Sequence, residues 1–343
     1  MKAIVYTEHG GPEVLKYKDV PDPQISPYEV LIRVRACALN HLDLWLRRGM
    51  PGITIPLPHI PGSDISGEVA RIGDKVTNVK VGDRVLLQPG ISCGKCEKCL
   101  AGEDNLCRAY TLFGRMVDGG CAEFVKSPAV NCVPIPANLN FEEAAAFPLV
   151  SLTAWHMLIT RAQLKPAETV LILAAGSGVG TAAIQIAKAT GARIIATAGS
   201  DAKLASAREL GADDVINHCT QKIAEEIKRL TNRRGVDVVF EHVGQATWQD
   251  SVRSLAVNGR LVTCGATTGP EGKIDIDYLF IRHLTILGSY MGSKAELFSA
   301  LELLRRGLLK PVIDVVLPLE KCAQAHERLE LREQFGKIVL RVP

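Results

Sequence analysis

The first part of the chain consists of short apolar runs separated by Gly and Pro. Between residue 1 and about residue 147 these runs include "KAIVY", "VLIRVRA", "EVARIG" and "DRVLL", which are only a few residues long and rich in β-branched side chains. Short runs of this composition, bounded by turn residues, are typical of β-strands. This part of the sequence therefore predicts an irregular, mostly β domain.

After Pro148 apolar runs alternate with helical patterns. The runs are "TVLILAA", "RIIATA", "VDVVFEHV", "GRLVTCGA" and "LTILGSY", and the first two are followed by "GTAAIQIAKATG" and "DAKLASARELG". Strands that alternate with helices predict an α/β domain with a doubly wound parallel sheet, here over residues 148–313. A last helix near "EKCAQAHERLELREQ" and a strand in "FGKIVLRVP" predict that residues 314–343 rejoin residues 1–147.

Length and charge agree with two globular domains. The 343 residues are too many for one ordinary core, and 40 basic against 37 acidic residues leave a formal charge of +3 with no basic cluster. We therefore expect no nucleic-acid partner. The start "MKAIVYTEHG" lacks the apolar run of a signal peptide, and the longest apolar stretch is broken by glycines. We expect a cytoplasmic protein without a membrane partner.

Four cysteines fall within fifteen residues. Cys93, Cys96, Cys99 and Cys107 have the spacing C-x2-C-x2-C-x7-C, which allows four thiolates to converge on one zinc ion from a small lobe at residues 90–108. Free thiols and an iron–sulfur cluster are the alternatives. Four protein ligands leave no open coordination position, so this spacing predicts a structural zinc site.

A loop of small residues follows the first strand of the α/β domain. In "LILAAGSGVGTAAIQIA" the candidate cofactor-binding residues are Ala175, Ser177, Gly178, Val179 and Gly180. Their amides and the helix N-terminus are suited to a pyrophosphate, although Ala175 and Ser177 replace the first two glycines of G-x-G-x-x-G. An ordinary strand-to-helix turn is the alternative.

The end of the next strand bears on cofactor choice. Ala198 stands where an NAD enzyme carries Asp or Glu for the ribose 2′-hydroxyl, and Ser200 and Lys203 follow as donors for a 2′-phosphate. Lys203 could equally be a solvated helix residue. The pattern favours NADPH, with NADH possible.

A β domain with an inserted four-cysteine lobe, followed by a Rossmann domain, resembles the medium-chain dehydrogenase/reductase superfamily over essentially the whole chain. The cysteines are similar to those of zinc-type alcohol dehydrogenases. The resemblance implies a GroES-like catalytic domain plus a Rossmann domain, one structural zinc, a cofactor cleft between the domains, and a homodimer or homotetramer.

The sequence departs from those dehydrogenases at their catalytic zinc. Asn40, Ser63 and Leu149 stand where the family has Cys, His and Cys, and Asp64 replaces the Glu after that His. Asn, Ser and Leu do not form a zinc site. The phrases "ALNHLDL", "PGSDISGEV", "AAGSGVG" and "TAGS" look like the quinone and enoyl reductase branch, which works without a catalytic metal.

The resemblance also implies individual cofactor contacts. Thr153 would lie beside the nicotinamide, Val243 beside the adenosine, and Cys264, Ser289 and Met291 along the nicotinamide. Ordinary Rossmann packing is the alternative for all five.

Two candidate catalytic residues fall at the family's substrate pocket. These are Asn40 and Asp43, which as a polar pair in a turn could instead hold the loop. His41, His59 and Cys37 lie near the missing ligands, so a displaced catalytic zinc remains open.

The combined pattern predicts an NADPH-dependent reductase of quinones or α,β-unsaturated carbonyls, including CoA thioesters. Hydride would pass from the nicotinamide to the electrophilic carbon while polar groups near Asn40 stabilise the oxyanion. The first alternative is a zinc-dependent alcohol dehydrogenase with a rearranged site. The second is a non-enzymatic cofactor-binding protein.

Overall fold

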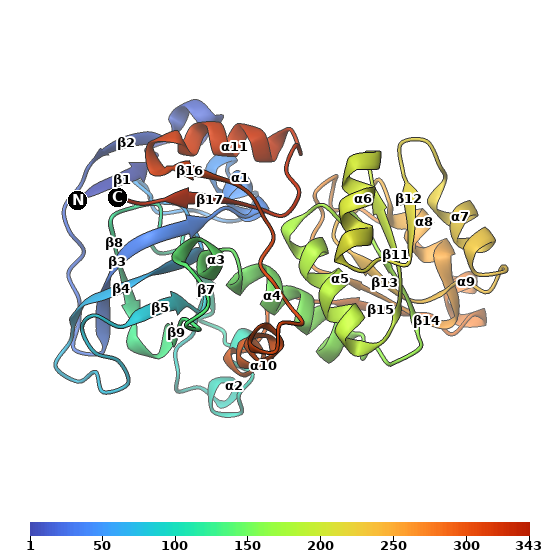
Figure 1. The fold of residues 1–343 in the computed structure, drawn as a ribbon, viewed down its shortest axis with the longest axis horizontal. Helices are drawn as coiled ribbons and strands as arrows, with labels where there is room; N and C mark the ends of the chain where they lie inside the picture. The colour runs from blue at the N-terminus through green and yellow to red at the C-terminus, as the bar shows by residue number, and fades with distance from the viewer. The chain divides into compact units, whose positions relative to one another are not determined.

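The computed structural model describes residues 1–343, which divide into two compact units. Unit 1 contains residues 1–149 and 311–343, and unit 2 contains residues 150–310. Both chain termini lie in unit 1, so unit 2 is an insertion in it (Figure 1). The sequence placed the two boundaries after residues 147 and 313, within two or three residues of these positions.

Unit 1 is built mainly from short strands. Its largest sheet has the strand order β16-β17-β3-β4-β5-β9, and β8 also pairs with β3. The strands of this unit are β1 (Lys2–Val5), β2 (Lys16–Asp19), β3 (Glu29–Ala38), β4 (Asp64–Ile72), β5 (Arg84–Leu87), β6 (Gly90–Ile91), β7 (Thr111–Leu112), β8 (Phe124–Pro128), β9 (Cys132–Pro134), β16 (Ile313–Pro318) and β17 (Lys337–Arg341). The helices are α1 (His41–Arg48), α2 (Glu97–Leu100), α3 (Phe141–Ala145) and α11 (Cys322–Glu330), with short turns η1 (Pro12–Val14), η2 (Asp104–Leu106), η3 (Ala129–Asn131) and η5 (Leu319–Lys321).

The C-terminal strand returns to the first domain, as the sequence predicts. β17 pairs antiparallel with β3, with Val339 opposite Ala38, and β4 pairs with the other edge of β3, with Asp64 also opposite Ala38. Apolar residues of β1, β3, β8, β17 and α11 pack in one buried cluster beneath this sheet. The register brings one end of β3 and the starts of β4 and β17 together.

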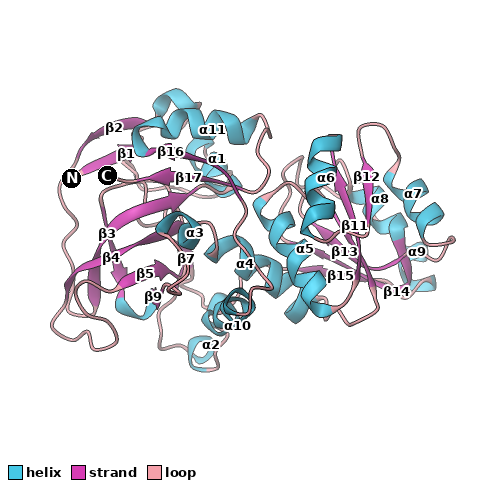
Figure 2. Cartoon of the chain, in the orientation of Figure 1, coloured by secondary structure: helices cyan, strands magenta, loops and turns pink.

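Unit 2 is a six-stranded parallel sheet between helices (Figure 2). Its strands are β10 (Thr169–Ile172), β11 (Arg193–Ala198), β12 (Asp214–Asn217), β13 (Val236–Glu241), β14 (Leu255–Thr263) and β15 (Thr285–Gly288). Its helices are α5 (Gly178–Thr190), α6 (Asp201–Leu210), α7 (Ile223–Leu230), α8 (Trp248–Ser254), α9 (Ile276–Ile281) and α10 (Lys294–Arg305). α4 (Pro148–Trp155) and the π-helical segment η4 (His156–Arg161) precede them.

The strand order of unit 2 reverses at β10. The chain first runs from β10 through β11 to β12 on one side, and then through β13, β14 and β15 on the other. In doubly wound sheets ligands bind at the carboxyl ends of the strands where this reversal occurs. The loop after β10 is the "AAGSGVG" segment, so the predicted cofactor loop lies at the reversal.

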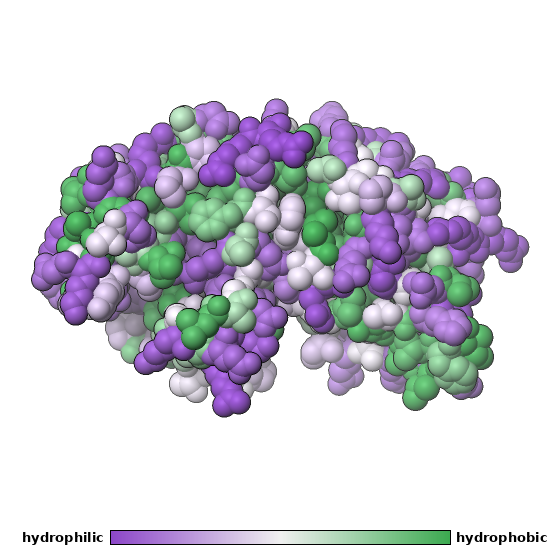
Figure 3. All heavy atoms as spheres, turned by 90° about the horizontal axis from the view of Figure 1, so that it is seen from below, coloured by the Kyte–Doolittle hydropathy of each residue, from purple (hydrophilic) through white to green (hydrophobic).

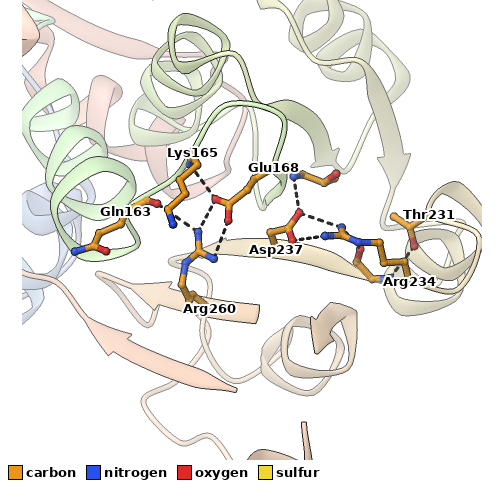
Figure 4. Close-up of polar contacts among 9 residues, drawn as sticks. Gln163, Lys165, Glu168, Thr231, Arg234, Asp237 and Arg260 are labelled. Carbon is orange, nitrogen blue, oxygen red and sulfur yellow. Dashed lines mark hydrogen bonds and ion pairs between the residues drawn. The ribbon is translucent and has the colours of Figure 1, made fainter. Parts of the chain in front are cut away.

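Ion pairs lie toward the other end of this sheet, where the strands have their amino ends (Figure 4). Arg260 at the middle of β14 contacts both carboxylate oxygens of Glu168, with its Nη2 2.6 Å from Oε2, and its Nε donates to the Ala162 carbonyl after η4 at 2.7 Å. Asp237 accepts from Arg234 and from the Thr169 amide at the start of β10. These contacts fix the amino ends of the central strands and leave the carboxyl ends for the cofactor loops.

No helix in the structure is long and apolar enough to cross a bilayer.

Candidate functional site

The four predicted zinc ligands lie together in a lobe of unit 1. The sulfur atoms of Cys93, Cys96, Cys99 and Cys107 are all within 4.8 Å of one another, and those of Cys96 and Cys99 are 3.5 Å apart. Backbone amides of Lys95 and Cys96 lower the pKa of Cys93 to about 6, which favours its thiolate form. No other group of three or more His, Cys, Asp or Glu side chains gathers this closely. The donor set fits one tetrahedral zinc.

A second polar cluster lies where β3, β4 and β17 meet. Asn40 follows β3, Asp64 begins β4 and Lys337 begins β17. The Asn40 Nδ2 atom donates to Asp64 Oδ2 at 2.9 Å, and Lys337 Nζ donates to Asn40 Oδ1 at 2.6 Å and to Asp64 Oδ2 at 2.8 Å. All three side chains are buried, although Asn40 retains 7% exposure. They form a closed triangle of hydrogen bonds.

Asp43 lies behind this triangle in the first turn of α1. It is fully buried, and its carboxylate accepts from the amides of Asn40 at 2.7 Å and Gly62 at 3.1 Å. Burial raises the pKa of Asp43 to about 6, although these two amides oppose the increase. A Cβ on Gly62 would lie 2.5 Å from Cys37 Sγ, so only glycine fits there. The structure favours the loop-holding interpretation of Asp43.

The residues considered for a displaced catalytic zinc are not brought together. His59 Nε2 is 2.9 Å from the Gly114 carbonyl, and Cys37 Sγ is 3.7 Å from Cys121 Sγ in the core. His41 packs edge-on against Trp45. Their donor atoms therefore point to separate partners.

The positions that carry zinc ligands in the resembled family do not offer a zinc site either. The Ser63 hydroxyl donates to the Phe113 carbonyl at 2.7 Å. Leu149 contributes only its backbone amide, which donates to Asp64 Oδ1 at 2.8 Å. The third position is Asn40, whose amide oxygen already accepts from an ammonium group. This donor set does not fit a zinc ion.

The loop after β10 has the features of a pyrophosphate site. Ser177 is the N-cap of α5, and its Oγ accepts from the Gly180 amide at 2.9 Å. The amides of Gly178 and Val179 in the first helical turn have no acceptor within the protein. A Cβ on Gly180 would lie 2.6 Å from the Ala174 carbonyl oxygen, so this turn requires glycine. Ala175 is buried and hydrogen-bonds through its amide to Thr197. Two free amides at a helix N-terminus fit a phosphate.

No acidic side chain stands at the last residue of β11. Ala198 is buried, and Ser200 caps α6 by accepting from the Lys203 amide at 3.4 Å. The nearest acid is Asp201, whose Oδ1 accepts from Asn217 Nδ2 at 2.9 Å. Lys203 lies on the first turn of α6, and its role remains a prediction.

Three of the predicted nicotinamide contacts lie in one region of unit 2. The Thr153 hydroxyl on α4 is 3.8 Å from Met291 Sδ, and Met291 has a left-handed backbone with φ of 55°. The Ser289 Oγ atom is buried without a hydrogen-bond partner, which is consistent with a polar ligand group beside it. Cys264 and Val243 follow β14 and β13, at the carboxyl edge of the sheet. The residues present fit a nicotinamide cofactor.

Unit 1 also contains a cavity of about 360 Å³. Two loops whose sequences contain no recognisable motif line part of this cavity. His59 and Ile60 belong to one loop, and Phe113, Met116 and Asp118 belong to the other. Asn40 and Lys337 do not line this cavity.

Sequence reasoning did not select Asp64 or Lys337 as site residues. Asp64 was noticed only as a replacement for a glutamate. Lys337 belongs to no sequence motif. Only the predicted return of the last strand to the β domain indicates that it could lie near the site.

We expect Cys99→Ser to lower stability because the zinc ion contributes folding free energy to the lobe. A loss of roughly 3 kcal/mol would lower Tm by about 6–12 °C for a unit of this size. Thermal unfolding with zinc analysis measures this, and Cys219→Ser, at an exposed thiol in unit 2, is the control. A variant with unchanged Tm that loses turnover would contradict the structural assignment.

Comparison with known proteins identifies the family. The model described as "Alcohol dehydrogenase GroES-like domain" matches residues 26–137, and "Zinc-binding dehydrogenase" matches residues 178–306. An alcohol dehydrogenase of Geobacillus stearothermophilus is 36% identical, covering 100% of both chains. A quinone oxidoreductase of Rattus norvegicus is 33% identical, covering 99% of this chain and 97% of its own. A crystal structure of an NAD-dependent alcohol dehydrogenase is similar with a TM-score of 0.97 and 48% identity, covering 100% of both chains. The chain therefore belongs to the zinc-type alcohol dehydrogenase-like family of medium-chain dehydrogenases/reductases, and it is an NAD(P)-dependent oxidoreductase.

Proposed function

We propose that this protein is an NADPH-dependent reductase of quinones or α,β-unsaturated carbonyls, CoA thioesters included. The observation that carries the proposal is the Asn40, Asp64 and Lys337 triangle, which fills the place of a catalytic zinc site with hydrogen-bonded side chains.

The chemistry of the two reactions explains why this matters. Oxidation of a neutral alcohol requires loss of its proton near pH 7, and in this family a metal cation stabilises the alkoxide. Reduction of a conjugated double bond places the negative charge on a carbonyl oxygen, which hydrogen-bond donors can stabilise. The second reaction therefore suits a site without metal ligands.

Asn40 is the group that we assign to this oxyanion. Bound NADPH would supply a hydride to the electrophilic carbon of the substrate. One Nδ2 hydrogen of Asn40 is bonded to Asp64, and the second has no partner within the protein. We propose that this second hydrogen, on a residue with 7% exposure, donates to the substrate carbonyl.

The alternative is a zinc-dependent alcohol dehydrogenase with a rearranged site. It is supported by the name of the Geobacillus stearothermophilus relative, whereas the name of the Rattus norvegicus relative supports quinone reduction. The separate partners of Cys37 and His59 favour the reductase over this alternative.

We expect NADPH-linked reduction of quinones or enones and weak or absent ethanol oxidation. Because only the cysteine lobe offers a zinc donor set, elemental analysis should find about one zinc per chain. Parallel assays with both substrate classes test this, before and after dialysis against a mild chelator. Two zincs per chain, with turnover that depends on the second, would establish the alcohol dehydrogenase instead.

The preference for NADPH rests on the end of β11. Position 198 carries no acid, Ser200 and Lys203 are possible donors, and Asn217 holds the carboxylate of Asp201. A ribose 2′-phosphate beside position 198 would therefore meet no carboxylate at that position, and the next acid along the chain, Asp201, is bonded to Asn217 through Oδ1.

We expect Ala198→Asp to weaken NADPH binding about tenfold or more, because the new carboxylate repels a 2′-phosphate and accepts from a 2′-hydroxyl. Dissociation constants for NADPH and NADH, measured by fluorescence titration, check this order. Ala198→Asn adds a similar volume without charge and is the matched control. Equal affinities for the two cofactors in the unsubstituted protein would refute the preference.

We further propose that the protein is a homo-oligomer joined through unit 2. β15 is the last strand in the sheet order, and on α9 the side chains of Ile276, Phe280 and Ile281 are 70%, 60% and 67% exposed. Ile286 on β15 is also exposed, and Figure 3 shows apolar atoms gathered on the surface of this unit. An exposed apolar edge strand is normally covered, and a second copy pairing by two-fold symmetry would cover it.

We expect Ile286→Lys to shift the protein to the monomer, because a charge on the edge strand opposes pairing. Sedimentation velocity measures the change. Leu331→Lys, at an exposed leucine of unit 1, is the control and should leave the assembly intact. An unchanged oligomer in Ile286→Lys would place the interface elsewhere.

A further inference from the structure

Lys337 reaches Asn40 because of strand register. β17 runs antiparallel to β3, with Val339 opposite Ala38, and the Leu39 amide donates to the Ile338 carbonyl at 2.9 Å. Continuing this pairing by two residues places Lys337, the first residue of β17, opposite Asn40. The contact thus joins residues that are 297 positions apart in the chain.

Each side chain of the triangle contacts both of the others. The distances are 2.6 Å between Lys337 Nζ and Asn40 Oδ1, 2.8 Å between Nζ and Asp64 Oδ2, and 2.9 Å between Asn40 Nδ2 and Asp64 Oδ2. The Lys337 residue has only 3% exposure and Asp64 has none, so water does not screen these contacts. The ion pair satisfies both buried charges.

We propose that Lys337 is a positioning residue that orients and polarises the Asn40 amide for the oxyanion of the reduced substrate. The inference rests on the proposed reductase function. It assigns to Lys337 a role in turnover in addition to the stability that its ion pair with Asp64 provides.

The orientation follows from the partners of the amide. An ammonium group only donates and an ionised carboxylate only accepts, so the amide oxygen must face Lys337 and the amide nitrogen must face Asp64. The reversed amide would place N–H against N–H and oxygen against oxygen. The triangle therefore holds Asn40 in one orientation, with one Nδ2 hydrogen bonded to Asp64 and the other directed away from it.

The polarisation follows from the charge. A cation at Oδ1 draws electron density from the amide, and this strengthens the remaining N–H as a donor in the same way that linked hydrogen bonds strengthen one another. Because Lys337 is already paired, no charge has to move when the substrate oxygen becomes negative. Such preorganised donors are worth most where water is excluded.

A double-mutant cycle separates this role from stability. Replacing Lys337 alone would leave Asp64 buried without a cation, so the variant of choice is the charge-neutral pair Asp64→Asn with Lys337→Met. The other arm is Asn40→Ala, and the third variant combines all three changes. Turnover with NADPH and an enone or quinone gives kcat and KM for each. Titration with a nitrophenolate, which carries the charge of a reduced quinone, gives an affinity that does not depend on turnover.

We expect Asn40→Ala to lower kcat about 100-fold and the neutral pair to lower it about tenfold or more, with KM for NADPH unchanged. Because Lys337 acts through Asn40, the combined variant should match Asn40→Ala alone within about twofold. Affinity for the nitrophenolate should fall in both arms and should not fall further in the combined variant.

A control uses another ion pair of unit 1, which is more exposed than the Asp64 and Lys337 pair. Asp314 Oδ2 accepts from Arg328 Nε at 2.8 Å, and the pair Asp314→Asn with Arg328→Met removes it. This variant should lose stability yet keep wild-type kcat.

Two results would overturn the positioning role. One is a combined variant in which the loss of kcat equals the product of the losses in the two arms. The other is a wild-type kcat in the folded Asp64→Asn, Lys337→Met variant. Failure of the proposed function has a different signature, since Asn40→Ala would then keep full kcat or the unsubstituted protein would reduce neither quinones nor enones.

Discussion

The antiparallel pairing of β17 with β3 is the constraint on which unit 1 depends. Although unit 2 separates the two strands in the sequence, the pairing adds the last strand of the chain to a sheet that begins near the N-terminus. Without this pairing the last residues of β3, Ala36–Ala38, would form an exposed edge, because β8 pairs only with Glu29–Arg33, and Asn40 would lose its contact with Lys337. The same register that completes the core thus places an ammonium group at the candidate site.

The buried charges near Asn40 are compensated within the protein. Asp64 accepts from Lys337, Asn40 and the Leu149 amide, while Asp43 accepts from two backbone amides. A zinc ion here would have to compete with a resident cation for the oxygen atoms of Asn40 and Asp64. The free energy of ionic groups buried in this way is favourable only when all of them are satisfied. In this network each buried charged group has a partner, and one Nδ2 hydrogen of Asn40 is left without an acceptor within the protein.

The architecture could be predicted from the sequence because the strands and helices of both domains have recognisable local patterns of apolar and polar residues. The alternation of runs such as "RIIATA" with helical segments fixed the parallel sheet, and the close spacing of Cys93 to Cys107 predicted the gathered thiols. The role of Asp43 could not be decided from the sequence, because two backbone amides, one of them from the distant Gly62, determine it. Lys337 was missed for the same reason, since its partners are contributed by strand register and not by neighbouring residues.

The two polar clusters of unit 1 differ in the chemistry that they can support. A zinc ion held by all four thiolates of the cysteine lobe would have no coordination position left for a substrate, so its role there would be structural. The triangle offers a hydrogen-bond donor of defined direction, held by an ammonium group whose charge Asp64 compensates, but no Lewis acid. A site of this kind cannot lower the pKa of an alcohol as a metal does, yet it can stabilise charge that is already delocalised onto a carbonyl oxygen. Under the proposed reductase function, the presence of Asn40, Ser63 and Leu149 at the three ligand positions corresponds, together with Lys337, to a different kind of oxyanion at the site.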